Sequence, residues 1–285
     1  MNLCDYDTIR ALLGRHGFHF SKSMGQNFLI DPQVPMDIAA ASGADEHCGV
    51  LEIGPGIGPL TAQLAQRAGK VVSVELDSSL LPVLAETMAP YPNVEIVPGD
   101  VLKLDLAALA AEKFQGLTPM VCANLPYNIT TPILEKLVET PCFERFTVMI
   151  QKEVAQRLCA PEGSAQGGSF SLFLRYYMEP EYLFDVPADR FLPPPKVTSA
   201  VIRCVRRSCP AVEVEDEAFF FKVMRGAFLL RRKTLSNSLA AALPGFSRTQ
   251  VQSAMERCGL APTVRGEALT LQDFAALARA LKEET

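Results

Sequence analysis

Short apolar runs alternate with helical patterns over the first half of the chain. Each run is bounded by glycine, proline or a polar residue, which is typical of a buried strand. Strands and helices that alternate at this spacing predict parallel strands joined by right-handed crossovers, the α/β class. The predicted strands cover residues 50–53, 71–75, 94–97, 120–123 and 146–151. The helical patterns between them begin near residue 60 and cover 79–88, 106–114 and 133–139.

The pattern changes after Ser208-Cys209-Pro210, where every later segment reads as helical. A long helix is predicted over 217–243, ended by a Pro-Gly pair, and two further helices are capped by Ser247 and Thr270. We therefore expect a catalytic domain over residues 1–208 and a small helical domain over 209–285. The other expected elements are helices over 5–19, 32–42 and 153–159, strands over 170–177 and 197–205, and a loop over 161–169.

Composition is that of a globular protein able to bury a core. The chain has 285 residues, of which 48% are hydrophobic and 21% charged. No apolar run approaches the ~20 residues of a membrane span. The N-terminus lacks the form of a signal peptide, so we expect a cytoplasmic protein, with monomer as the default. The eight cysteines contain no C-x-x-C and do not cluster with the three histidines, which favours reduced thiols and no metal.

Charge is unevenly distributed along the chain. The net charge is −5, yet residues 190–233 carry ten basic and four acidic side chains, about +6. A local excess of this kind is how an acidic protein can carry a phosphate-binding face. Arg231-Arg232-Lys233, on the predicted long helix, could instead be a solvated helix end.

A glycine-rich loop follows the first predicted strand, in the pattern Glu52-x-Gly54-x-Gly56-x-Gly58. Glycines let the backbone approach a ligand closely. A dinucleotide fingerprint is G-x-G-x-x-G, and here the third glycine comes one residue early. The Glu52 carboxylate is unfavourable beside a pyrophosphate and acceptable beside an ammonium and a sulfonium. The loop therefore favours S-adenosylmethionine over NAD.

Two further acids end the next two strands. Glu75 is placed to accept hydrogen bonds from both ribose hydroxyls of a nucleotide, and Asp100 to accept from an adenine amine. Either acid alone would more often be a strand-end cap or a solvated residue. Three strand ends that carry acids around one glycine loop indicate a single nucleotide-like site.

The stretch Asn124-Leu125-Pro126-Tyr127 ends the fourth predicted strand. Pro126 biases Leu125 away from the helical region, so the Leu125 carbonyl should point outward. That carbonyl and the Asn124 amide oxygen can accept both hydrogens of an exocyclic amine, and Tyr127 offers a stacking face. The four residues resemble the Asn/Asp-Pro-Pro-Tyr motif of adenine-N6 methyltransferases. The resemblance implies that they orient the amine and stack on the base.

Over nearly its whole length the chain resembles the small-subunit (16S) ribosomal RNA adenine-N6,N6-dimethyltransferases. The resemblance implies a Rossmann-like class I methyltransferase domain with a C-terminal helical domain. It also implies cofactor contacts by Asn27, Leu29, Gly54, Glu75, Asp100 and Asn124, with Phe191 near the target base. The stretches that carry it are Gly25–Leu29, Glu52–Gly58, Glu75, Gly99-Asp100, Asn124–Ile129, Gln151–Leu158, Phe191–Val201 and Arg231–Leu239.

The implied reaction is methyl transfer from S-adenosylmethionine to N6 of two adjacent adenosines in 16S rRNA, within the small (30S) subunit or its precursor. No strong general base is needed, because the methylated, cationic amine loses a proton readily. With this resemblance, Lys196 and Arg231-Arg232-Lys233 are predicted to contact RNA phosphates. Ala165 and Gly167 depart from the family, which usually has a Lys and a Tyr in that loop.

Two rival interpretations stay open at this point. One is the large-subunit rRNA dimethyltransferase that confers macrolide resistance; Leu125 and the Arg231–Leu239 motif count against it. The other is a ribosome-assembly or transcription factor that kept the fold and lost catalysis, against which the intact Asn124, Tyr127, Glu75 and Asp100 argue.

Overall fold

The structure, a computed structural model, describes residues 1–18 and 27–284. They form two compact units, Met1–Ala155 with Pro180–Arg206, and Gln156–Glu179 with Arg207–Thr285. Compactness thus groups residues 156–179 with the second unit, and the functional boundary at residue 208 stays a prediction. Residues 19–26, which include Gly25 and Gln26 of the N-terminal motif, lie outside the described part. No helix in the described ranges is long and apolar enough to cross a membrane.

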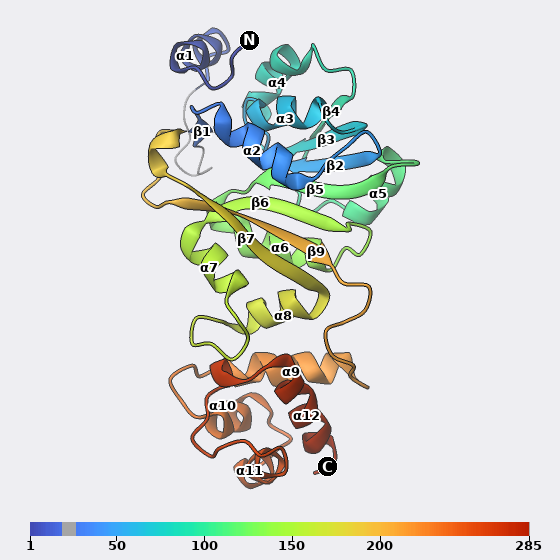
Figure 1. Cartoon of the computed structure of the whole chain (residues 1–285), viewed down its shortest axis with the longest axis vertical. Helices are drawn as coiled ribbons and strands as arrows, with labels where there is room; N and C mark the ends of the chain where they lie inside the picture. The colour runs from blue at the N-terminus through green and yellow to red at the C-terminus, as the bar shows by residue number, and fades with distance from the viewer. Residues whose placement is uncertain (19–26, 285) are drawn as a thin grey trace. The chain divides into compact units, whose positions relative to one another are not determined.

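A seven-stranded sheet forms the centre of the first unit, with strand order β4-β3-β2-β5-β6-β9-β7 (Figure 1). Strands β2 to β6 run parallel, and β9 pairs antiparallel with β6. The five predicted parallel strands and the α/β class are therefore confirmed. The strands are β2 Cys48–Ile53, β3 Lys70–Glu75, β4 Val94–Pro98, β5 Thr118–Asn124, β6 Arg145–Gln151, β7 Met178–Val186 and β9 Ser199–Arg206.

Helices cover both faces of this sheet because the strands are apolar on both sides. Val50, Val71 and Met120 lie in one row and form a core cluster with α2 and α3. On the opposite face, Gly49 lies against the ring of Phe114, which ends α5. The helices of this unit are α1 Tyr6–Arg15, α2 Gln33–Ser42, α3 Pro59–Ala65, α4 Leu81–Met88, α5 Leu106–Lys113 and α6 Thr130–Val138.

A small second sheet joins two segments that are far apart in sequence. Strand β1 (Phe28–Leu29) pairs antiparallel with β8 (Phe191–Leu192), and Leu29 lies opposite Phe191. The Ile30 N–H donates to the Arg190 carbonyl at 2.9 Å, which extends the pairing. The N-terminal motif and the Phe191 motif therefore meet in space.

The second unit is helical, as predicted for the end of the chain (Figure 1). Tyr176 on α8 packs on Phe220 and Phe221 of α9 and donates a hydrogen bond to Glu217 at 3.1 Å. Both predicted caps, Ser247 and Thr270, form capping boxes. The helices are α8 Ser169–Tyr177, α9 Glu217–Ala227, α10 Leu235–Ala242, α11 Arg248–Arg257 and α12 Leu271–Lys282, and α7 Lys152–Cys159 crosses the boundary between the units.

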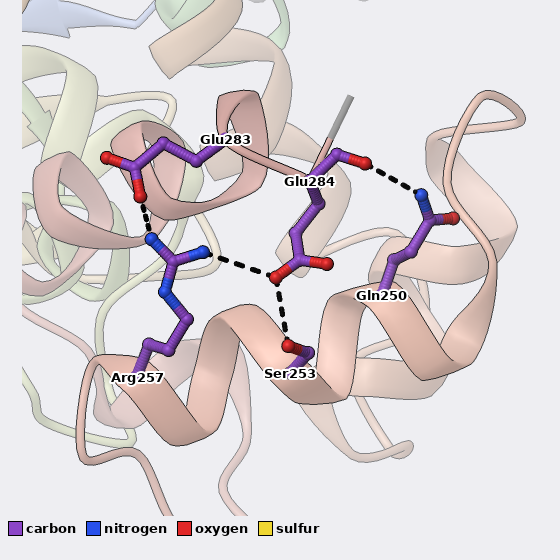
Figure 2. Close-up of polar contacts among 5 residues, drawn as sticks. All are labelled: Gln250, Ser253, Arg257, Glu283 and Glu284. Carbon is purple, nitrogen blue, oxygen red and sulfur yellow. Dashed lines mark hydrogen bonds and ion pairs between the residues drawn. The ribbon is translucent and has the colours of Figure 1, made fainter.

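The end of the chain is fixed to α11 by a polar cluster (Figure 2). Glu284 accepts from Ser253 at 2.9 Å and pairs with Arg257 at 3.2 Å through its carboxylate, and its carbonyl accepts from Gln250 at 2.9 Å. Arg257 also pairs with Glu283. These contacts hold the residues after α12 against α11.

The predicted strand over 170–177 is wrong, because this segment is the helix α8. Its aromatic residues suggested a strand, yet they contact one another at helical spacing, as in the 5.5 Å edge contact between Phe173 and Tyr177. Packing on α9 overrides the local β-propensity. The strand β7, just after α8, was not predicted; it contains Pro180 and lies at the sheet edge, where proline is tolerated.

The predicted long helix over 217–243 is also wrong. It ends at Ala227, and a turn over 228–234 leads into α10. The buried Ser238 hydroxyl stabilises this turn, since it donates to the Gly226 carbonyl at 2.7 Å and accepts from the Leu230 N–H at 3.0 Å. Arg231-Arg232-Lys233 therefore lies in a turn rather than within a helix.

Candidate active site

An open cavity lies at the carboxyl ends of β2, β3 and β5 and just past the end of β4. Its volume is about 1210 Å³, including the solvent space at its mouth. Ligands of open α/β sheets bind at this edge. All the residues predicted to bind cofactor or target base line it: Asn27, Leu29, Gly54, Glu75, Asp100, Asn124, Leu125, Pro126, Tyr127 and Phe191.

The glycine loop lines the cavity through Gly54 and Gly56. Gly54, Gly56 and Gly58 have φ angles of 68°, 63° and 94°, which favour glycine over other residues. At Gly54 the space that a Cβ would occupy is open, so the backbone here is accessible to a ligand. At Gly58 an added Cβ would lie 2.4 Å from the Cε of Met88, the flexible end of that side chain, so Met88 would have to shift.

Glu52 is a buried carboxyl beneath the loop, with a side chain 1% exposed. Its Oε2 accepts hydrogen bonds from Thr61 at 2.6 Å and Ser73 at 2.7 Å. Burial raises the pKa of Glu52 to about 7. The two hydrogen bonds act to lower this pKa, and the nearby charge of Glu75 acts to raise it. A cationic ligand in the cavity would favour its ionised form.

Glu75 and Asp100 lie on the same rim. The Glu75 carboxylate accepts from the Asp77 N–H at 2.8 Å and is 3.4 Å from the Gly56 N–H, so it is oriented by backbone donors. Burial raises its pKa. Asp100 accepts from the Leu102 N–H at 3.0 Å and pairs with Lys103 at 3.6 Å. The two acids line one cavity from neighbouring strands, as predicted.

The Asn-Leu-Pro-Tyr turn is anchored to β6. Asn124 lies opposite Met149, and the Leu125 N–H donates to the Met149 carbonyl at 3.0 Å. Pro126 is extended, at φ −60° and ψ 127°, and its carbonyl accepts from the Thr130 hydroxyl at 3.0 Å. The backbone of the turn is thus fixed on both sides of the predicted amine-binding atoms.

Two aromatic rings contribute to the cavity wall near this turn. Tyr127 is half-buried, its hydroxyl lies 2.5 Å from the Ser199 Oγ, and burial raises its pKa, so the phenol is neutral. Phe191 is 2% exposed and is held through the β1–β8 pair. Tyr127 is therefore the ring more available for stacking on a ligand.

Seven of the ten basic residues between residues 190 and 233 fall into two groups. Arg203 pairs with Glu181 at 2.6 Å, and Arg207 pairs with Glu179 at 2.8 Å. Arg206 donates to carbonyls at the end of α6, including the Val138 carbonyl at 2.9 Å. These three side chains are used in internal contacts, so the local charge excess overstates the free positive surface.

The four predicted RNA contacts belong to the other group. Lys196 is exposed in the first unit, and Arg231, Arg232 and Lys233 are exposed in the second. Within residues 1–18 and 27–284, none of the four forms an ion pair. Their charges are available to a polyanion.

Sequence reasoning missed several cavity residues. Leu76 and Val101 each follow a strand-end acid and line the cavity, and Leu76 is 54% exposed. A large apolar residue directly after a strand-end acid could have indicated that these two residues line the cavity. Phe28 was in a recognised motif without a role. No group of three metal-ligating side chains occurs in the described ranges, and the absence of a metal stays a prediction.

Comparisons with known proteins bear on the family of the chain. A family model described as ribosomal RNA adenine dimethylase matches residues 17–283. The chain is 48% identical to "Ribosomal RNA small subunit methyltransferase A" of Streptococcus sanguinis, over 100% of this chain and 99% of that protein. It is 49% identical to the protein of that name from Geobacillus thermodenitrificans, over 95% of this chain and 94% of the relative.

Solved structures of the same fold give a consistent result. A 23S rRNA methyltransferase, ErmE, matches with a TM-score of 0.66 and 27% identity, over 90% of this chain and 100% of that one. A dimethyladenosine transferase from Plasmodium falciparum matches in fold with a TM-score of 0.74 at 23% identity, over 90% of this chain and 98% of that one. The Rossmann-like methyltransferase fold with a helical C-terminal part is thus confirmed, and the chain belongs to the ribosomal RNA adenine dimethylase family.

Proposed function

We propose that this protein transfers methyl groups from S-adenosylmethionine to N6 of two adjacent adenosines in 16S rRNA, giving N6,N6-dimethyladenosine during maturation of the small ribosomal subunit. The observation that carries the proposal is one cavity that joins the glycine loop and strand-end acids to the Asn-Leu-Pro-Tyr turn. Family membership supports methyl transfer to rRNA adenine. The names of the relatives at 47–49% identity support the small subunit.

The charges and the open backbone of the cavity support binding of this cofactor. The open backbone at Gly54 and the acids Glu52 and Glu75 suit a ligand that carries an ammonium, a sulfonium and a ribose. Glu75 is the acceptor for the ribose hydroxyls and Asp100 the acceptor for the cofactor's adenine amine, while Leu76 and Val101 offer apolar contacts to the adenine ring. When bound, the cofactor supplies an electrophilic methyl group.

The Asn-Leu-Pro-Tyr turn would hold the target base. The Asn124 side-chain oxygen and the Leu125 carbonyl accept hydrogen bonds from N6, which favours a pyramidal nitrogen and supports the positive charge that develops there. Tyr127 stacks on the ring and Phe191 lines the wall beside it. Positioning of N6 in line with the methyl–sulfur bond supplies much of the rate enhancement. The N6 lone pair would form the new bond to the methyl group that the cofactor supplies, with a thioether as the leaving group, and the N6 proton would pass to water.

The exposed Arg231-Arg232-Lys233 turn, with Lys196, would contact RNA phosphates. The turn that carries these three cations covers residues 228–234, between α9 and α10. The hydrogen bonds of Ser238 to the Gly226 carbonyl and the Leu230 N–H hold the start of its backbone. A backbone that is already held loses less conformational entropy on binding than a flexible one. The target adenosines must be presented unstacked, since N6 is inaccessible in a stacked helix.

The experiment that tests this function is methyl incorporation from labelled S-adenosylmethionine. The substrates are small subunits without adenine dimethylation, fully modified small subunits, and large subunits. Label in unmodified small subunits alone, recovered as N6,N6-dimethyladenosine, is expected. Label in large-subunit RNA would contradict the proposal and favour the resistance-type activity. Binding to small subunits without any label would identify a non-catalytic assembly factor.

Three finer expectations accompany the proposal. The protein acts as a monomer and without a metal, so chelators should not change the rate. The loop with Ala165 and Gly167 in place of the family's usual Lys and Tyr contributes little to RNA affinity, so restoring a lysine at residue 165 should tighten binding at low salt.

A further inference from the structure

The hydroxyl of Tyr127 is held from a part of the chain 72 residues away. Its oxygen lies 2.5 Å from the Oγ of Ser199, and the Ser199 residue is fully buried. Ser199 belongs to the motif that follows Phe191, but no role follows from its place in that motif. The contact joins a cavity residue to the start of β9.

The direction of β9 explains how Ser199 reaches this position. Strand β9 runs antiparallel to β6, so its first residue lies at the edge where the parallel strands end. On one side of β6, Ser199 of β9 lies opposite Gln151, the last residue of β6. On the other side of β6, Asn124 of β5 lies opposite Met149. The sheet therefore brings a buried hydroxyl beside the turn that holds Tyr127.

The two partners differ in how firmly their backbones are held. Ser199 is within the ladder between β6 and β9, and the preceding Thr198 carbonyl accepts from the Lys152 N–H at 3.0 Å. Tyr127 begins a single 3-10 turn, closed by the Ile129 N–H to the Pro126 carbonyl at 3.3 Å. Ser199, whose backbone is held in the sheet, thus anchors the hydroxyl end of the Tyr127 ring.

We propose that Ser199 is a positioning residue for methyl transfer, which fixes the axis of the Tyr127 ring and thereby the place of the target adenine. The proposal rests on the proposed function, in which that ring stacks on the base. The phenol oxygen lies on the axis of the ring, so the hydrogen bond sets the direction of that axis. Burial of the neutral phenol makes an unpaired hydroxyl unfavourable and keeps the pair together.

Loss of the hydrogen bond between Ser199 and Tyr127 should slow the chemical step. A small tilt of the ring displaces N6 from the line of attack, and displacements of about 1 Å can cost roughly 100-fold in rate. Loss of one of several constraints should lower kcat by about tenfold. The cofactor affinity and the KM for the ribosomal substrate should change by less than about twofold, since neither the cofactor acids nor the basic turn is altered.

The test is a double-mutant cycle in methyl transfer to unmodified small subunits. We would compare Ser199→Ala, Tyr127→Phe and the double variant with the wild type, and measure cofactor affinity by calorimetry. Each single variant is expected to lower kcat about tenfold, and the double variant to be no slower than either. Ser199→Thr, which keeps the hydroxyl, should restore most of the rate. Ser42→Ala is the matched control, because Ser42 is equally buried and donates to the Ala39 carbonyl at 2.7 Å on α2, outside the cavity.

A wild-type kcat in Ser199→Ala or in Tyr127→Phe would overturn the inference, as would losses that multiply in the double variant. If Ser199→Ala does not fold, Tyr127→Phe alone decides, because it removes the same hydrogen bond without altering β9. An inactive wild type would instead contradict the proposed function, so the two failures are distinguishable.

Discussion

Replacement of Glu52 by Gln should remove a pH-dependent loss of stability from the first unit. The Glu52 carboxyl is buried, and its pKa is raised from 4.5 to about 7. Between these values the folded protein binds more protons than the unfolded chain, so the free energy of unfolding falls as pH rises. The loss begins near pH 4.5 and is complete above about pH 7. At about 1.4 kcal/mol per pKa unit, it amounts to about 3 kcal/mol.

The Gln variant keeps an oxygen that can accept from Thr61 and Ser73, and it has no charge to titrate. Its free energy of unfolding relative to the wild type should therefore rise by about 3 kcal/mol between pH 4.5 and 7.5. Native-state hydrogen exchange of β2 and β3, corrected for intrinsic rates and measured without cofactor, reports on this unit alone.

Glu95→Gln provides a control of opposite sign. Glu95 pairs with Lys113 at 2.6 Å and Lys70 at 3.0 Å, and these contacts hold its pKa below the usual value. Its carboxylate stabilises the fold above the unfolded pKa of 4.5. When the pH range is extended downward, the free energy of unfolding of this variant relative to the wild type should therefore fall as pH rises toward 4.5 and stay level above it. A stability difference for Glu52→Gln that does not change with pH would refute the reasoning about burial.

Three further predictions follow from other parts of the chain. Gly58→Ala should destabilise the first unit by about 2 kcal/mol in thermal unfolding, because Gly58 has a φ of 94° that other residues rarely adopt; wild-type stability would contradict this. Ser238→Ala should cost about 2 kcal/mol and increase amide exchange over residues 228–234, since it removes the two hydrogen bonds that the buried hydroxyl makes with the Gly226 carbonyl and the Leu230 N–H. Arg232→Ala should reduce the slope of log affinity for RNA against log salt by about 0.7–0.9, and an unchanged slope would exclude a phosphate contact.

The sheet and the cavity at its edge were predictable because their signals are local. A fully buried parallel strand reads as an apolar run, and its end is marked by the acid or amide that follows, as at Glu75 and Asn124. Because parallel strands end at one edge, residues far apart in sequence could be placed in one cavity without knowledge of contacts.

The errors arose where tertiary contacts decide the local structure. Helix α8 contains aromatic residues with β-propensity, and its packing on α9 is not visible in the sequence. The end of α9 at Ala227 depends on a hydroxyl supplied from α10. The pairing of Ser199 with Tyr127 depends in the same way on the register between β6 and β9. A charge count likewise could not separate the internally paired Arg206 from the exposed Arg232.

The role proposed for the acceptors at the end of β5 is to hold the adenine amine for methyl transfer. It is tested most directly by single-turnover transfer from labelled S-adenosylmethionine to unmodified small subunits, with wild type, Asn124→Ala and Asn124→Asp. We expect Asn124→Ala to lower the rate by at least about 100-fold, and Asn124→Asp, which keeps an acceptor oxygen, to retain measurable transfer. Near-wild-type transfer by Asn124→Ala, with N6,N6-dimethyladenosine as product, would contradict the account.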